Sequence, residues 1–204
     1  MEAAAEPRFG GSVALFIYLI LINNNMKIGT KSVLYGAHCF FLHPWFVAKA
    51  WNDLYGFPWD PRLWVAFFVH DLGYWGKPNM DGEEGELHPY FGAEVMGWLF
   101  GKEWYDFSLY HSRFLAKRNG AQFSKLCVAD KLAIAITPSW LYIPMVKATG
   151  ELAEYMKDAE RNSNGDIEVQ DDPYVWHAKV QDYVTRWVAE HKDGTQDTWT
   201  QNRD

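Results

Sequence analysis

Residues 63–76 read LWVAFFVHDLGYWG, and this stretch decides the fold class. Its first seven residues are apolar and run into the pair His70-Asp71, and Gly73 follows at a point where a helix can end. The helix also has a clear start, because Asp60 can cap free backbone N–H groups and Pro61 suits the first helical position. A helix is therefore predicted over residues 61–71.

The rest of the chain repeats this design. Thr137-Pro138 and Asp172-Pro173 carry the same start signature, and Pro144 is expected to kink or split the helix that contains it. No segment alternates polar and apolar residues as a strand does. The predicted fold is all-α, a single helical bundle with short punctuated loops. Helices are expected at about 31–55, 61–71, 89–100, 103–117, 122–136, 138–160 and from 173 onward.

The two ends of the chain differ from this pattern. Residues 1–25 form a leader with the apolar run VALFIYLILI at 13–22, and residues 192–204 form a polar tail that should fray. The run is too short for a membrane span, which needs about 20 residues. It can be a buried strand or helix or a peripheral membrane or partner contact, or Met26 can be the natural start.

Composition limits the function. The chain has 204 residues and a formal net charge of −7. An extended nucleic-acid surface usually needs a basic face and is not expected, whereas a small anionic substrate held by metal ions is compatible with this charge. The only cysteines, Cys39 and Cys127, lie far apart in apolar surroundings. A disulfide scaffold is therefore not expected, and a reducing cytoplasm is the predicted location.

Histidines carry the chemistry. Five of the seven histidines lie between positions 38 and 111, including the central His70. The His70-Asp71 pair alone would be weak evidence for a metal site. Asp130 lies in the apolar helix LCVADKLAIAI, where a buried carboxylate is costly unless something pairs with it. A bound divalent cation would pair with this carboxylate.

The order His43, His70-Asp71, His88, His111 and Asp130 resembles the HD superfamily of metal-dependent phosphohydrolases. HPYFGAEVM at 88–96 is similar to the HPxxGAE segment of its six-ligand variant, as in HD-GYP-related phosphodiesterases. YHSRFLAKRNG at 110–120 and KLCVADKLAIAIT at 125–137 resemble the stretch that follows it. The resemblance implies one HD domain over 26–191, with its signature at 38–136. Tyr74 replaces the lysine common after the HD pair, and the GYP signature is absent, so cyclic-dinucleotide hydrolysis does not follow.

What the resemblance implies is a binuclear centre with catalytic His70 and Asp71. Asp71 would bridge two divalent ions (Mn, Fe, Co, Ni or Zn). The six implied ligands are His43, His70 and Asp130 on one ion, His88 and His111 on the other, and the shared Asp71.

Several assignments have alternatives. His38 competes with His43 as the first ligand; if both lay on one helix they would point about 140° apart, and His43 is preferred. His177 and His191 are expected at the surface. Arg113 and Lys117 are predicted to bind the anionic substrate, with Tyr74 and Trp75 lining the pocket.

Two enzyme classes compete. The first is a phosphohydrolase acting on a nucleotide, another phosphomonoester or a phosphodiester through a metal-activated water. The alternative is an HD-type mixed-valent diiron oxygenase that cleaves a C–C or C–P bond with O₂. A degenerate fold that only binds ligands is a third class, and the intact ligand set argues against it.

Overall fold

The computed structural model describes residues 25–162, 167–169 and 171–194, and every regular element in those residues is a helix. The all-α prediction is therefore confirmed. The α-helices are α2 (Ile28–Tyr35), α3 (His43–Tyr55), α4 (Pro61–Val69), α5 (Pro89–Phe100), α6 (Lys102–Leu109), α7 (Arg113–Arg118), α8 (Lys125–Ile136), α9 (Ser139–Thr149), α10 (Glu151–Asn162) and α11 (Pro173–His191). Short 3₁₀ helices occupy Leu72–Tyr74 (η1) and Gly85–Leu87 (η2).

Two of the three predicted helix starts have the expected cap. The carboxylate of Asp60 accepts the backbone N–H of Arg62, and that of Asp172 accepts the N–H of Tyr174. The third prediction was wrong. Thr137 closes α8 instead of opening α9, because its hydroxyl donates back to the carbonyl of Ala133 at 2.7 Å.

Three predicted helices are each divided in two. Residues 36–42 separate α2 from α3, and residues 110–112 separate α6 from α7. The third division falls at Gly150, whose φ of 91° is left-handed, and not at Pro144, which α9 accommodates. Glycine reaches this conformation without a steric cost, so it ends a helix more effectively than a proline near a helix start.

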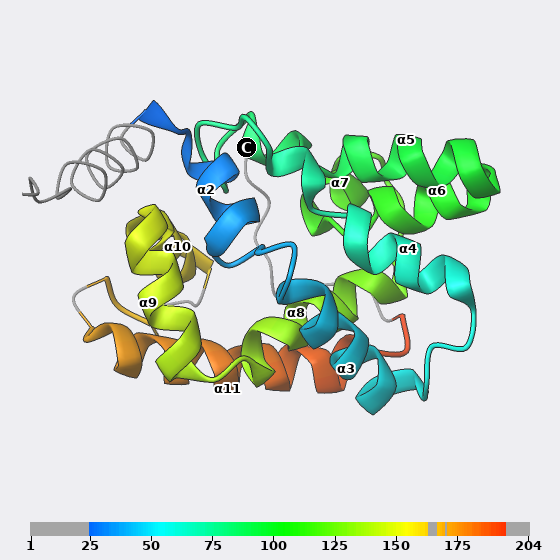
Figure 1. The fold of residues 1–204 in the computed structure, drawn as a ribbon. Coiled ribbons are helices and arrows are strands. Elements are labelled where there is room, and N and C mark those ends of the chain that lie inside the picture. The colour runs from blue at the N-terminus through cyan, green and yellow to red at the C-terminus, as the bar shows by residue number, and fades with distance from the viewer. Residues whose placement is uncertain (1–24, 163–166, 170, 195–204) are drawn as a thin grey trace, which may run out of the picture.

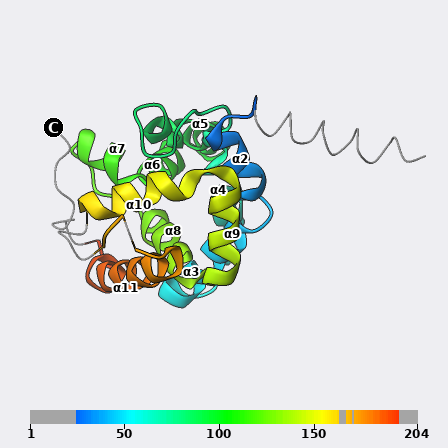
Figure 2. The ribbon, with the colours of Figure 1, turned by 90° about the vertical axis from the view of Figure 1, so that its left-hand side faces the viewer.

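The helices pack around α8, which lies near the middle of the molecule in both views (Figures 1 and 2). One face of α8 packs on α3 in a core that also takes side chains from α4 and α5. This core contains Leu126 of α8, Trp51 of α3, Phe67 of α4 and Met96 of α5. Another face packs on the long α11, where Trp187 is buried. Because both faces are covered, the polar Asp130 inside α8 is held in the interior.

The prediction that His177 and His191 lie at the surface was wrong. Both are buried in α11. The ring of His177 stacks on Tyr142 with 4.5 Å between centroids, and its Nδ1 lies 2.9 Å from the hydroxyl of Ser139. The ring of His191 stacks on Trp187 and bonds that residue's carbonyl. Their spacing places them on the packed stripe of α11, where an imidazole is stable if one nitrogen is hydrogen-bonded.

His177 should make the fold sensitive to acid. Burial lowers its pKa from 6.5 to about 4. The unfolded chain therefore takes up a proton at a higher pH than the folded one, and stability present above pH 6.5 is lost as the pH falls toward 4, by about 3 kcal/mol in total. Urea unfolding at pH 7.5, 5.5 and 4.5 measures this loss. The His177→Gln variant should lose less stability over this range, and parallel profiles for the two proteins would contradict the prediction.

No single helix in the described part of the chain is long and apolar enough to cross a membrane. The helices α8 and α9 meet those criteria only as a pair, across a bend of 102°. The apolar run at 13–22 lies outside the described residues, so its alternatives stay predictions.

Candidate metal centre

Six buried side chains from five parts of the chain meet at one point. His43 is the first residue of α3, and His70 ends α4 with Asp71 directly after it. Three further residues complete the set: His88 precedes α5, His111 lies between α6 and α7, and Asp130 lies within α8. These are the six residues that the sequence pattern singled out, now brought together in space.

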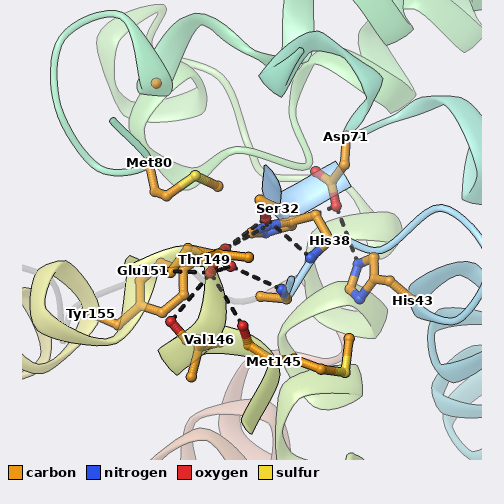
Figure 3. A network of polar contacts seen from close by, with 12 residues as sticks. Ser32, His38, His43, Asp71, Met80, Met145, Val146, Thr149, Glu151 and Tyr155 are labelled. Atoms are coloured by element: carbon orange, nitrogen blue, oxygen red, sulfur yellow. Dashed lines mark hydrogen bonds and ion pairs between the residues drawn. The ribbon is translucent and has the colours of Figure 1, made fainter. Parts of the chain in front are cut away.

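The first group consists of His43, His70, Asp71 and Asp130. Because α3 packs on α8, the Nε2 atom of His43 reaches Oδ1 of Asp130 at 3.0 Å. It also lies 3.2 Å from Oδ2 of Asp71 (Figure 3). The Nε2 atom of His70 lies 2.9 Å from the same Oδ2 and 3.7 Å from Asp130. Two carboxylates and two imidazoles thus converge on one small volume.

The second group consists of Asp71, His88 and His111. The Nε2 atoms of the two histidines lie 3.1 Å apart, at 3.5 and 3.4 Å from Oδ1 of Asp71. Oδ2 of Asp71 faces the first group and Oδ1 faces the second. Asp71 is therefore shared, with one oxygen for each group.

Backbone carbonyls orient three of the imidazoles. Nδ1 of His70 lies 3.0 Å from the carbonyl of Phe67, that of His88 lies 2.7 Å from Gly85, and that of His111 lies 2.5 Å from Ser108. A carbonyl can only accept, so each Nδ1 must carry the proton. A neutral imidazole then has its lone pair on Nε2, the atom that faces the group.

The contacts within the groups fit metal ligands better than hydrogen bonds. Nε2 of His70 and Oδ2 of Asp71 are buried and have no hydrogen-bond partner, although they are neighbours. Metal–ligand bonds of about 2.1 Å place adjacent ligand atoms roughly 3.0–3.4 Å apart, close to the spacing found here. Imidazole with carboxylate is a donor set for Mn²⁺, Fe²⁺, Co²⁺, Ni²⁺ or Zn²⁺. The buried cluster can therefore hold divalent metal ions.

The buried carboxylates of the first group favour a positive charge beside them. Burial opposes a charge on His70, but Asp71 and Asp130 outweigh it and raise its pKa to about 10. Burial alone would raise the pKa of Asp71, yet the neighbouring imidazoles, led by His70, hold it well below its usual range. In the second group, burial and His111 lower the pKa of His88 well below 6.5. The first group attracts positive charge, and the second offers a neutral ligand.

Two glycines let the chain approach the cluster closely. A Cβ on Gly73 would lie 1.9 Å from the carbonyl oxygen of His88, and one on Gly92 would lie 2.8 Å from Cα of His70. Both neighbours are backbone atoms that cannot swing aside. The glycines of the HDLGY and HPYFGAE segments therefore set the positions of His88 and His70.

Gly73→Ala should damage the second group selectively. The new methyl group must push the His88 backbone away, which separates His88 from His111 and Asp71 and should weaken cation binding at least about tenfold. Calorimetric titration with Zn²⁺ or Co²⁺ measures this. Gly97→Ala in α5 is the matched control, since its Cβ would meet the Tyr105 side chain, with Cδ2 at 3.0 Å and Cβ at 3.1 Å, and no backbone atom near the cluster. Equal affinities for the two variants would count against the prediction.

His38 does not lie on a helix with His43, so the prediction that a shared helix would point the two side chains about 140° apart was wrong. The break at 36–42 lets both rings approach the cluster, with centroids 5.5 Å apart. His43 lies in the first group, whereas Nε2 of His38 stops 4.0 Å from Oδ2 of Asp71. His38 therefore lies beside the cluster, a position that a continuous helix over residues 31–55 would not have allowed.

The four predicted substrate residues lie in different surroundings. Tyr74 is buried, and its ring stacks on His88 with 3.8 Å between centroids. Trp75 is 60% exposed, and no ring contact or hydrogen bond joins it to the cluster. The guanidinium of Arg113 lies 5.1 Å from the centroid of the Trp187 ring, and Lys117 is exposed. The structure brings Tyr74 alone of these four to the cluster, and the substrate roles of all four stay predictions.

No protein-family model, curated protein or solved structure matches this chain.

Proposed function

We propose that this protein is a metal-dependent phosphohydrolase of the HD superfamily with a binuclear centre. The observation that carries the proposal is the position of Asp71, whose two carboxylate oxygens face two separate sets of imidazole ligands. A shared carboxylate between two such sets is the arrangement that a two-metal hydrolase needs, because the ions must act on one reacting group together. The family resemblance of the sequence supports the same assignment.

The ligands divide as the geometry groups them. His43, His70 and Asp130 would hold one ion, His88 and His111 the other, and Asp71 both. Bound divalent ions would make water a competent nucleophile at neutral pH and withdraw charge from a phosphoryl group. The chain's own residues orient the ligands through the Nδ1 bonds to backbone carbonyls and exclude bulk water by burial.

The proposed substrate is a small phosphoester, such as a nucleotide, another phosphomonoester or a phosphodiester. Tyr74 would form one wall of its site, because the ring already covers His88. Arg113 and Lys117 are proposed to bind the negative charge of the substrate, and Trp75 to line the outer edge. The net charge of −7 does not oppose an anionic substrate, since bound ions supply local positive charge.

One observation favours the diiron oxygenase as a second candidate. Tyr74 stands where a lysine is common in the hydrolases, and its ring contacts both His38 and His88. An aromatic wall beside the centre suits a less charged substrate than a lysine does.

Metal analysis and activity measurements separate the two candidates. The protein is purified without O₂ and its bound metals are determined. A panel of phosphoesters is then tested with added Mn²⁺ or Co²⁺, both in air and under anaerobic conditions. Phosphate release that is indifferent to O₂ supports the hydrolase. Two irons with O₂ consumption and no phosphate release support the oxygenase, and a protein that binds no divalent metal would contradict both.

A further inference from the structure

A fully buried carboxylate lies close behind the metal centre. Glu151, the first residue of α10, has no exposed surface, and each of its oxygens has two hydrogen-bond donors. Oε1 accepts the hydroxyls of Ser32 at 2.6 Å and Tyr155 at 2.7 Å, and Oε2 accepts the N–H of Ala37 at 3.2 Å and the hydroxyl of Thr149 at 2.5 Å (Figure 3). Burying a charge is costly unless it is hydrogen-bonded. Four donors on two oxygens therefore indicate that the Glu151 carboxylate is ionised and held in place.

Gly36 lies directly against the Glu151 carboxylate. A Cβ on Gly36 would lie 2.1 Å from its Oε2, so only glycine allows the backbone at the end of α2 to approach the carboxylate. The pKa of Glu151 is held below 4.5, because the surrounding donors and His38 outweigh its burial. Glu151 is therefore an acceptor at neutral pH.

Glu151 sets the direction of the next hydrogen bond. Ser32 has a single hydroxyl proton, and it is donated to Glu151. The Ser32 oxygen can then only accept from Nδ1 of His38, which lies 2.8 Å away, and it also accepts the backbone N–H of His38 at 3.3 Å. Nδ1 of His38 therefore carries a proton, so the neutral ring has its lone pair on Nε2.

Nε2 of His38 faces the metal centre without joining it. It lies 4.0 Å from Oδ2 of Asp71, beyond hydrogen-bond distance and farther than the 2.9–3.5 Å that separates the cluster histidines from the Asp71 oxygens. The ring is held between Tyr74, at 4.6 Å between centroids, and the edge of His43. The His38 side chain is 15% exposed, more than that of any of the six cluster residues. An oriented acceptor thus lies at the accessible edge of the centre.

We infer that His38 is a specificity-determining residue that accepts a hydrogen bond from an O–H group of the bound substrate through Nε2. Ser32 and Glu151 are positioning residues that hold its ring and its tautomer. The substrate class that fits is a phosphoester that presents a hydroxyl, or the protonated oxygen of its own phosphate group, beside Asp71. This inference rests on the proposed function for the identity of the substrate, but not for the orientation of His38.

Nitrogen NMR of ¹⁵N-histidine-labelled, zinc-loaded protein tests the orientation. We expect the wild-type protein to show His38 protonated at Nδ1 and unprotonated at Nε2. Glu151→Gln has the same shape but can donate to Ser32, so it should abolish this preference. Glu160→Gln, on the exposed face of the same helix, should preserve it. Protonation at Nε2 in the wild-type protein, or the same tautomer in Glu151→Gln, would overturn the positioning role.

Inorganic phosphate serves as the probe for the substrate contact. Binding should shift the Nε2 signal of His38, and His38→Gln should weaken phosphate binding about tenfold, the equivalent of one hydrogen bond, while keeping its zinc content. If phosphate binds and neither the signal nor the affinity changes, the inference about His38 fails while the proposed function stands. If the wild-type protein binds zinc but no phosphate, the hydrolase proposal fails and so does the substrate contact. Loss of zinc in His38→Gln would show that His38 is a ligand instead.

Discussion

Asp71→Ala is expected to bind neither metal ion and to lose at least about 100-fold in activity, since even partners outside the ligand shell contribute 10- to 100-fold. The reason is geometric. Oδ2 of Asp71 lies 2.9 Å from His70, and Oδ1 lies 3.4 Å from His111, so one substitution removes a ligand from both groups. Metal analysis of protein purified without O₂ gives the stoichiometry, and the phosphoester panel gives the activity.

Two further variants sharpen this test. His111→Ala removes a ligand from the second group alone, so it should keep the ion of the first group and lose the other. Asp106→Ala, which removes only an exposed ion pair with Lys102, should bind both ions and remain active. If Asp71→Ala lost one ion and kept the other, Asp71 would not be shared and the binuclear proposal would be wrong.

The sequence predicted helices well where local signals decide them. Asp60 and Asp172 cap their helices because a carboxylate beside a proline can satisfy a free N–H without help from the rest of the fold. The divisions at 36–42 and 110–112 were not predicted, since the sequence there contains no proline. The first division brings His38 beside the cluster and the second contains the cluster residue His111, so tertiary packing fixes both divisions.

The cluster residues were predicted from their order, and their neighbours were not. The resemblance of the sequence around His70-Asp71 and Asp130 to a metal-binding pattern implied these ligands, whereas nothing in the sequence relates Glu151 to Ser32, 119 residues earlier. His38 was not expected to act together with His43, because on a continuous helix the two side chains would have pointed apart. Buried His177 was missed for a similar reason, since an isolated histidine gives no sign of the stacking partner that covers it.

The cation should also stabilise the fold. His43, Asp71, His88 and Asp130 belong to segments that are far apart in the chain, and the ions would join these segments at a point where no hydrophobic contact can. A ligand that binds only the folded state stabilises it by about 4 kcal/mol at a thousand times its dissociation constant. For a chain of this length, such a change corresponds to a rise in melting temperature of about 10 °C.

Stripping the metals with a chelator should therefore lower the melting temperature by about that amount, and added Mn²⁺, Co²⁺ or Zn²⁺ should restore it. Calorimetry or circular dichroism measures the shift. In Asp71→Ala, which lacks the shared ligand, chelator and metal should have no effect, whereas Asp106→Ala should behave as the wild-type protein does. Equal melting temperatures for the stripped and loaded wild-type protein would contradict the metal centre, because ions that bind six buried side chains of the folded chain must stabilise it.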